Sequence, residues 1–418
     1  MVIEYDRRAS VFAVFCGQDF RLKMMTSYHY LPLKSCGRSE SGIFLVIRSS
    51  LLTTTDDRRP GKLVMLQAQV TNNNKSPHKL TSFNFLLTKP QIAAPYRNTM
   101  SVCKSKDDTV CRSKVDVEYP DITAKVFAFG SCHKNSKAVK PNQPIVWDAI
   151  SALKPDVFLW AGDTIYTSKK SGISPLNLIQ EEYNQLATNE TLGYSTFISN
   201  SEVEGYLKGG VHGTWDDHDY GANDYGQQMP NRKERQNLLL DFFGVDENDE
   251  RRERDGVYSS VTFGKTPQQV KVIFLDTRSA RSKHCIPSVG AWPLPFGMGS
   301  AFACLTRWVS AGLKLQEFIP RCKNAKVLDE AQWTWLEEQL LGTEAQVNIL
   351  VSSIQVLTTN PMTESWGQFP EERKRLLSIL NQKRVAIISG DVHHAEVLVA
   401  GGGSGKLLEV TSSGLTHR

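Results

Sequence analysis

The sequence predicts an α/β fold, in which short buried strands alternate with helices. After about residue 125, five apolar runs have the length of buried strands and end at polar residues. These runs are Val126–Phe129, Val157–Trp160, Val272–Leu275, Asn348–Val351 and Val385–Ile388. Helical patterns lie between them, and this alternation is typical of a sheet covered by helices. We therefore expect most of the chain to form one α/β domain.

The region before that domain has a different character. Residues 1–120 are rich in Ser, Thr and Asn and show no sustained periodicity, with strand-like runs at Leu63–Val70 and Ser82–Leu87. We expect this region to be irregular or a small β module, and residues 121–418 to form the main domain.

Two segments between the strands have the apolar spacing of helices. They are Ile145–Leu153 and Leu328–Leu341, and in the second Asp329 and Gln332 form a plausible capping arrangement. A third segment, Arg232–Asp255, is dense in charges of both signs, so we expect a solvated helix followed by a loop.

Charge and composition exclude several classes of protein. The 49 Lys and Arg against 44 Asp and Glu leave a formal net charge of +5, far from the concentrated basic face of a nucleic-acid binder. With 40% hydrophobic and 22% charged residues, the chain is not collagen-like, coiled-coil or wholly disordered. The longest apolar runs near the N-terminus are too short for a membrane span, so we expect no transmembrane segment in this chain.

The compartment is indicated by cysteines and by short acceptor motifs. Disulfides could close within the polar stretches around Cys103 and Cys111 and among Cys285, Cys304 and Cys322. The N-terminus lacks the apolar stretch of a secretory signal, whereas two segments match the glycosylation pattern, Asn74-Lys75-Ser76 and Asn189-Glu190-Thr191. We favour a secreted or endomembrane protein, with the cytoplasm as the alternative.

Residues with metal-binding or catalytic chemistry follow the predicted strands directly. Three strand ends read Gly-Ser-Cys132-His, Gly-Asp163-Thr-Ile-Tyr166 and Gly-Asp391-Val-His393-His394, and a further segment reads Trp-Asp-Asp217-His218-Asp. Each could be a turn, a helix cap or an inert buried thiol. Because the carboxyl ends of parallel strands meet at one edge of a sheet, the groups should converge, and together they favour a metal site.

The order of these motifs, with Ser-Ser-Ile-Gln355 between the last two strands, resembles the PhoD-like alkaline phosphatases of the calcineurin-like metallophosphatase superfamily. The resemblance covers about residues 125–415. It implies a four-layer α/β/β/α sandwich with a metal cluster at one edge. It also implies hydrolysis of small-molecule phosphate esters, either monoesters or diesters. The charge balance indicates no nucleic-acid partner.

The same resemblance implies a cluster of ferric iron with calcium or another divalent cation. Asp163 would bridge the two metals, and Cys132 and Tyr166 would bind the iron, since thiolate and phenolate are anionic. Hard oxygen ligands suit calcium. The other expected ligands are Asp217, Asn223, Asp391 and His393.

In the mechanism that the family implies, a metal-bound hydroxide attacks phosphorus. His218 would stabilise or protonate the leaving oxygen, and Gln355 and His394 would offer polar contacts to the substrate. The family usually continues beyond a segment such as Thr411–Thr416, whereas this sequence ends at Arg418. The alternative is therefore a catalytically inactive protein of the same fold that binds metal or a phosphorylated ligand.

Two other chemistries are excluded by spacing. Cys132 is not followed by the Cys-x5-Arg loop of cysteine phosphatases, because Ala138 stands at the Arg position. The segment Gly401–Lys406 resembles a P-loop but lacks its leading Gly and its final Ser or Thr, so we expect a hairpin turn there.

Overall fold

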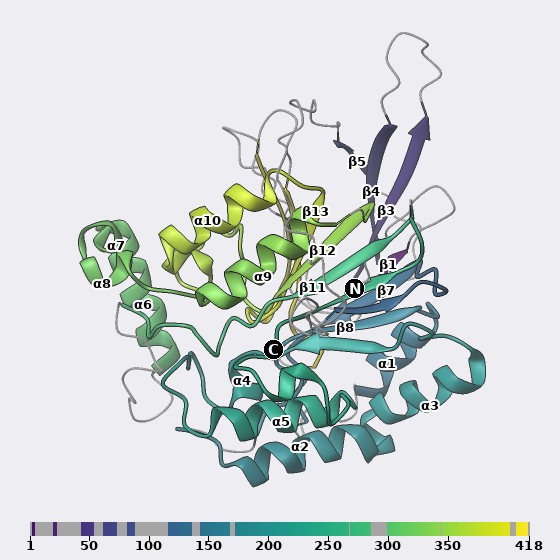
Figure 1. Cartoon of the computed structure of the whole chain (residues 1–418), viewed down its shortest axis with the longest axis horizontal. Coiled ribbons are helices and arrows are strands. Elements are labelled where there is room, and N and C mark those ends of the chain that lie inside the picture. Colours follow the sequence, from purple (N-terminus) through teal and green to yellow (C-terminus); the bar gives the residue numbers. More distant parts are fainter. Residues whose placement is uncertain are drawn as a thin grey trace, which may run out of the picture.

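The computed structural model describes the chain from residue 116 onwards with six gaps, and several strands before it. The described residues are 2–4, 20–22, 43–53, 62–72, 82–87, 116–135, 143–167, 172–266, 268–285, 299–343, 345–401 and 407–416. Within them, two β-sheets pack face to face and helices cover both outer faces (Figure 1). The predicted α/β class and the four-layer α/β/β/α architecture are confirmed.

The first sheet joins the N-terminal strands to the first strands of the main domain. Its strand order is β5 (Ser82–Leu87), β4 (Lys62–Asn72), β3 (Ile43–Thr53), β1 (Val2–Glu4), β7 (Val126–Gly130), β8 (Val157–Ala161) and β9 (Val211–Thr214). The strands β7, β8 and β9 are parallel, with Phe127 opposite Val157 and Phe158 opposite Val211. Their carboxyl ends therefore share one edge.

The second sheet contains the later strands. Its order is β2 (Phe20–Leu22), β14 (Ala395–Ala400), β15 (Leu407–Ser412), β13 (Val385–Ser389), β12 (Val347–Ser352), β11 (Val270–Phe274), β10 (Ser259–Phe263) and β6 (Asp116–Tyr119). The neighbours β11, β12, β13 and β15 are parallel. The antiparallel pair β14 and β15 matches Ala400 with Leu407, as the two strands of a hairpin do, and the predicted turn itself lies mostly outside the described residues.

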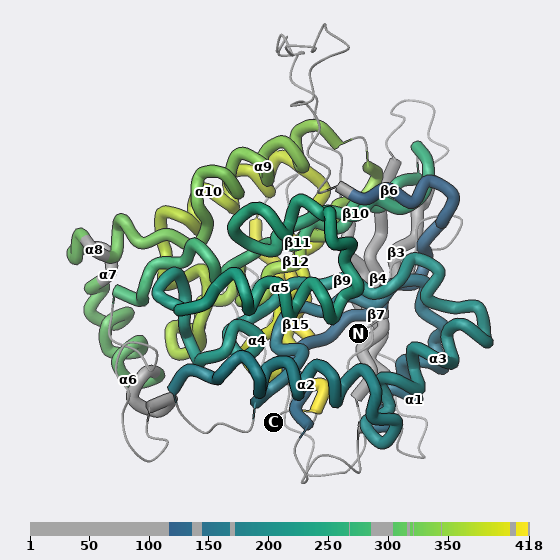
Figure 2. The backbone as a smooth tube through the Cα atoms, turned by 60° about the horizontal axis from the view of Figure 1, so that its bottom comes forward, coloured from purple at the N-terminus to yellow at the C-terminus, as the bar shows by residue number. Residues whose placement is uncertain are grey.

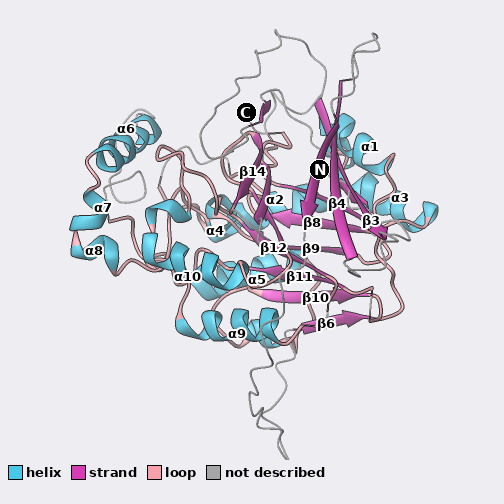
Figure 3. Cartoon of the chain, turned by 90° about the horizontal axis from the view of Figure 1, so that it is seen from above, coloured by secondary structure: helices cyan, strands magenta, loops and turns pink. Residues whose placement is uncertain are grey.

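Alternating side chains divide the interior into three cores. On β8, Val157, Leu159 and Ala161 face the second sheet, whereas Phe158 and Trp160 face the outer helices. This period of two is what a strand covered on both faces requires. The core outside the first sheet is formed with four helices, α1 (Gln143–Ser151), α2 (Leu176–Thr188), α3 (Tyr194–Glu204) and α5 (Arg232–Phe242). The core outside the second sheet is formed with α9 (Glu330–Leu341) and α10 (Pro370–Leu380) (Figure 3).

The predicted elements agree with the observed ones within a few residues, since all five apolar runs are strands: β7, β8, β11, β12 and β13. The helix expected at Ile145–Leu153 is α1, which begins and ends two residues earlier than expected. The cap of α9 is confirmed, because Asp329 Oδ1 accepts a hydrogen bond from the Gln332 amide at 2.8 Å.

The prediction for the charged segment Arg232–Asp255 is only partly correct. The segment contains α5 and a short 3-10 turn at Glu250–Arg252, but α5 is not solvated all round. Arg235 is buried and donates to the carbonyl oxygens of Ser174 at 2.8 Å and Tyr220 at 3.1 Å. A side chain with five donors can satisfy backbone carbonyls, which is why this arginine lies inside.

Four further helices are α4 (Asp217–Tyr220), α6 (Gly299–Gly312), α7 (Leu315–Phe318) and α8 (Pro320–Lys323). A disulfide joins Cys285 to Cys322, so one pairing within the predicted cysteine group is confirmed, and Cys304 is free. Cys103, Cys111 and the Asn74 acceptor motif lie outside the described residues. No helix in the described part of the chain is long and apolar enough to cross a membrane.

Candidate metal centre

The ends of β7 and β8 bring the first polar groups together. Cys132 and Asp163 both have left-handed backbone, with φ of 59° and 49°, which L-residues adopt rarely. Gly162 precedes Asp163 at φ 91°, and a Cβ there would lie 2.5 Å from the Asp216 Cβ. The sharp turns place Cys132 Sγ 3.6 Å from Asp163 Oδ2, which accepts a 2.5 Å hydrogen bond from the Tyr166 hydroxyl.

The end of β13 reaches the same place from the second sheet. Asp391 and His393 are also left-handed, with φ of 69° and 55°. A Cβ on Gly390 would lie 2.6 Å from the Ala161 carbonyl oxygen, so only glycine permits this approach of the two sheets. His393 Nε2 lies 3.1 Å from the Tyr166 hydroxyl. One cluster therefore contains residues from both sheets.

The short helix α4 adds the acidic segment that follows β9. Asp216 is its N-cap, and a reciprocal capping box with Asp219 fixes the turn. The His218 amide donates to Asp163 Oδ1 at 3.1 Å, and the His218 ring lies 4.1 Å from that of Tyr166, centre to centre. Residues that the sequence predicted to converge thus meet.

The described residues contain four groups of possible ligand atoms, and the atoms within each group lie within 4.8 Å of one another. One group, Asp224 with His284 and Glu364, shares no residue with the others, which lie at the strand ends. Successive groups of these other three share Asp163 or Asp217, so they form one continuous donor set. The three groups are Cys132 with Asp163 and His393, Asp163 with Asp217 and His218, and Asp216 with Asp217 and Asp391.

The charges of this donor set repel one another. Burial raises the pKa of Asp163 well above its ordinary value, and the neighbouring Asp217 and Asp216 carboxylates raise it further. Burial and the Asp163 carboxylate do the same to the pKa values of Cys132 and Tyr166. Burial also raises the pKa of Asp391. A bound cation would reverse the direction of these shifts, because it stabilises the deprotonated groups.

Unpartnered oxygens provide a direct test of whether a metal fits here. Asp217 Oδ1 and Asp216 Oδ2 are buried and have no hydrogen-bond partner among the described residues. Buried carboxylate oxygens are normally satisfied, and a metal ion is one of the groups that satisfies them. The donors also match the chemistry, since thiolate and phenolate suit ferric iron and carboxylates suit hard divalent cations. The residues therefore fit a metal cluster.

Four of the predicted site residues lie outside these donor groups, and one of them, Tyr166, contacts Asp163 and His393 directly. The other three lie further away. Gln355 is buried, and its amide donates to Glu396 Oε2 at 2.9 Å and Thr411 Oγ1 at 3.0 Å. His394 Nε2 lies 3.8 Å from the same Glu396 oxygen. Asn223 is half-buried in the turn after α4, next to Asp224, whose amide donates to Asp217 Oδ2 at 2.8 Å. Their roles stay predictions.

Ser413 is a site residue that the sequence reasoning missed. It follows β15, and its Oγ lies 3.0 Å from Cys132 Sγ and accepts a hydrogen bond from the His393 amide at 2.7 Å. A bridge between Ser131 and Ser413 brings β7 and β15 side by side (Figure 2). Its position directly after a strand was the signal that could have identified it.

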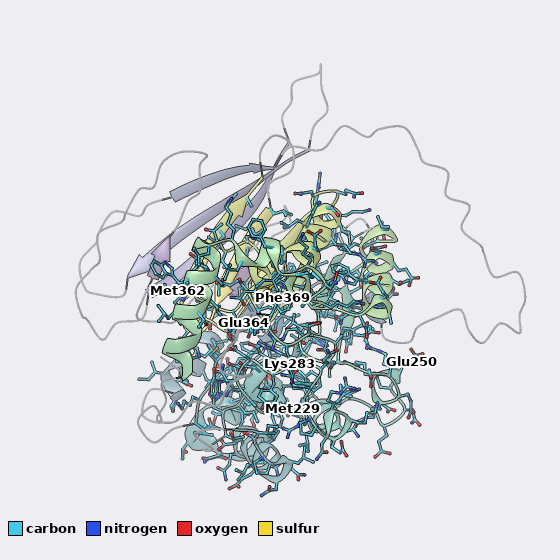
Figure 4. The ribbon with its side chains drawn as sticks, turned by 90° about the vertical axis from the view of Figure 1, so that its left-hand side faces the viewer. Met229, Glu250, Lys283, Met362, Glu364 and Phe369 are labelled. Atoms are coloured by element: carbon cyan, nitrogen blue, oxygen red, sulfur yellow. A yellow bond between two sulfur atoms is a disulfide. The ribbon has the colours of Figure 1, made fainter. Side chains whose placement is uncertain are left out.

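A buried network of ion pairs behind the cluster was also missed. Arg278 donates to Asp216 Oδ1 through Nε at 2.6 Å, and its NH1 lies 3.0 Å from Glu364 Oε2. Glu364, in the interior of the molecule in Figure 4, also contacts Arg281 and His284. Burial raises the pKa of Glu364, but the Arg278 and Arg281 charges outweigh burial and hold it well below its ordinary value.

The chain matches a known family of proteins. The family model for the PhoD-like phosphatase matches residues 127–400, from β7 to the end of β14. The match spans the donor groups described above. A search of curated proteins found no matching relative.

Proposed function

The chain belongs to the PhoD-like phosphatase family, and from this membership we propose that it is a metal-dependent hydrolase of small phosphomonoesters or phosphodiesters. The observation that carries the proposal is the continuous donor set at the place where the two sheets meet. Two of its buried carboxylate oxygens have no hydrogen-bond partner among the described residues. Burial and neighbouring negative charges make these acidic groups costly to ionise, and a bound cation would stabilise their ionised forms.

We assign the donors to two metals by their chemistry. Cys132, Tyr166 and His393 would hold ferric iron, with Asp163 shared between both ions. Asp217, Asp391 and Asn223 would hold calcium or another hard divalent ion. Bound metals supply positive charge that neutralises the phosphate ester and activates water for attack on phosphorus.

His218 is the group proposed to act on the leaving oxygen. Its side chain is 32% exposed, so it can reach a bound ester, and its backbone amide holds Asp163 in place. Burial lowers the pKa of the His218 imidazole, which favours the neutral ring. A neutral imidazole still carries one N–H, which can donate to the oxygen that gains charge as the ester bond breaks.

Elemental analysis combined with hydrolysis assays tests the proposed function. We expect the purified chain to contain metal, to hydrolyse an aryl phosphomonoester or phosphodiester, and to lose turnover after chelation. Asp163→Asn should abolish the turnover. Bound metal without turnover of either ester would instead support the alternative, a metallophosphatase-fold protein that binds metal or a phosphorylated ligand without catalysis.

A further inference from the structure

Ser413 lies between two turns that carry proposed metal ligands. It directly follows β15 and is buried. The turn after β7, in the first sheet, carries Cys132, and the turn after β13, in the second sheet, carries His393. The contacts of Ser413 with both turns therefore bear on how the two ligands are held.

The contacts with the His393 turn come from the side chain and from the backbone of Ser413. The His393 amide donates to Ser413 Oγ at 2.7 Å, and the Ser413 amide donates to the His394 carbonyl oxygen at 3.2 Å. His393 has left-handed backbone, with φ of 55°. L-residues adopt this conformation rarely, and it persists only where neighbouring contacts hold it. Ser413 supplies two of these contacts.

The contacts with the Cys132 turn bring the Ser413 hydroxyl to the sulfur. A bridge pairs Ser131 with Ser413, and the amides of Gly414 and Leu415 donate to the Ser131 carbonyl oxygen at 3.2 and 3.1 Å. Ser413 Oγ lies 3.0 Å from Cys132 Sγ. The backbone pairing thus fixes the segment whose hydroxyl meets the sulfur.

The direction of the hydrogen bond between Ser413 and Cys132 depends on the state of the thiol. A neutral thiol has its own proton, which it can direct to Ser413 Oγ or to Asp163 Oδ2, 3.6 Å away. A thiolate that binds a metal has no proton, so it can only accept. A serine hydroxyl has one proton and two lone pairs, so Ser413 can accept the His393 amide and donate to the sulfur at the same time.

Ser131 and Tyr166 also have hydroxyls near the sulfur, but neither is equally placed to donate. Ser131 Oγ lies 3.6 Å from Cys132 Sγ and donates to the Ser412 carbonyl oxygen at 3.0 Å. Its single proton is used in that shorter contact. The Tyr166 hydroxyl interacts with Cys132 as well, but as a phenolate ligand it has no proton to give. Ser413 is therefore the best-placed hydroxyl donor among the described residues.

We propose that Ser413 is a positioning residue of the metal centre, which accepts the His393 amide and donates its hydroxyl proton to the Cys132 sulfur when a metal is bound. This inference rests on the metal centre of the proposed function. A hydrogen bond to a thiolate withdraws electron density from the sulfur, so it raises the energy of charge transfer from sulfur to metal. Because one oxygen serves both contacts, it also orients ligands from the two sheets relative to each other.

The experiment uses Co²⁺ as the probe, in protein freed of its metals by chelation and then reloaded. Wild type should show a charge-transfer band from sulfur to Co²⁺, and Cys132→Ser should remove it. Ser413→Ala should move the band to longer wavelength and weaken Co²⁺ binding, measured against a competing chelator, by about tenfold or more. Ser413→Thr keeps the hydroxyl and should keep the wild-type band.

Ser352→Ala is the matched control. Ser352 is also buried, and its hydroxyl accepts from Trp366 Nε1 at 3.0 Å and donates to the Ile354 carbonyl oxygen at 2.7 Å, so neither contact involves a donor-group residue. This variant should leave the band and the Co²⁺ affinity unchanged. The proposal would be overturned by an unshifted band in Ser413→Ala, by an equal shift in Ser352→Ala, or by a wild-type protein without a band that depends on Cys132.

A measurement on wild type tests the same hydrogen bond without a substitution. The Co²⁺–sulfur stretching frequency in resonance Raman spectra should shift in D₂O, because the donated proton exchanges with solvent. An unshifted frequency would refute the hydrogen bond even if Ser413→Ala did not fold.

Ester hydrolysis, assayed separately, distinguishes this inference from the proposed function. A band that shifts in Ser413→Ala, in a protein that hydrolyses no ester, would refute the hydrolase proposal and leave the role of Ser413 standing. Ester turnover combined with an unshifted band in Ser413→Ala would refute the role of Ser413 and leave the hydrolase proposal standing.

Discussion

Arg278 Nε donates to Asp216 Oδ1 at 2.6 Å, and both side chains are fully buried. Asp216 caps the helix that contributes Asp217 and His218 and belongs to a donor group itself, so this ion pair connects the donor set to the buried arginine. Burial raises the pKa of Asp216 to about 7, and the Arg278 charge opposes that shift. The arginine therefore favours the ionised carboxylate that the cap requires.

Replacing this arginine should destabilise the protein strongly. Arg278→Met leaves the Asp216 carboxylate buried without its cation, which we expect to lower the free energy of unfolding by about 3–5 kcal/mol. Arg375→Met removes ion pairs to Glu330 and Glu337 from a 36% exposed arginine and should lower it by less than about 1 kcal/mol. Urea unfolding of both variants measures the difference. Equal effects would contradict an organising role for the buried pair.

Loss of the shared carboxylate should remove both metals. Asp163 lies in two of the donor groups, so Asp163→Ala deletes a ligand from each proposed site. Elemental analysis of the purified variant should show both metals strongly reduced. The control is Asp121→Ala at an 86% exposed aspartate, which should keep the wild-type content. Full metal content in Asp163→Ala would show that the carboxylate is not shared.

The proposed iron site predicts a visible absorption band. A phenolate bound to ferric iron absorbs visible light by charge transfer, and Tyr166 is the phenol that contacts Asp163 of the donor set. Tyr166→Phe should remove the band, whereas Tyr206→Phe, whose hydroxyl donates to the Phe197 carbonyl oxygen at 2.7 Å, should keep it. A colourless wild-type enzyme with full activity would be inconsistent with ferric iron on Tyr166.

The role of His218 predicts a dependence on the leaving group. His218→Ala should lower the rate for phenyl or alkyl esters by about 10²-fold, because these leaving oxygens need a proton or hydrogen-bond donor. For nitrophenyl esters the loss should be smaller, since that leaving group is stable as an anion. Steady-state rates over the series test this. Equal losses of rate for all esters of the series would contradict a role of the His218 imidazole at the leaving oxygen.

Buried His133 should make the protein less stable in acid. Burial lowers its pKa from 6.5 to about 3. The unfolded chain therefore binds a proton below pH 6.5 that the folded protein does not, so this contribution to stability is complete above pH 6.5 and falls as the pH drops. Between pH 6.5 and 5 the loss is about 2 kcal/mol.

Urea unfolding at both pH values, for wild type and His133→Gln, isolates that contribution. The acid-induced decrease in stability should be smaller in the variant by about 2 kcal/mol. An identical pH dependence in the two proteins would show that His133 is not the neutral buried group described here.

Much of the fold could be predicted because its signals are local. Apolar runs of strand length, such as Val157–Trp160, report burial on both faces, and the cap at Asp329 reports a helix start. The same logic identified Cys132, Asp163 and Asp391, because each stands directly after such a run. The buried helix residue Arg235 escaped prediction, since a charged side chain reveals its interior partners only once other segments pack around it.

The sequence by itself determined the strand and helix order, the residue types that follow each strand and the family. The tertiary structure decided which of those residues meet. Cys132 contacts Ser413 across 281 positions, and Glu364 pairs with arginines 86 or fewer positions away, because two sheets pack face to face and their carboxyl ends converge. Local periodicity encodes which side of an element is buried, whereas distances between elements, and the pKa shifts that depend on them, exist only in the packed molecule.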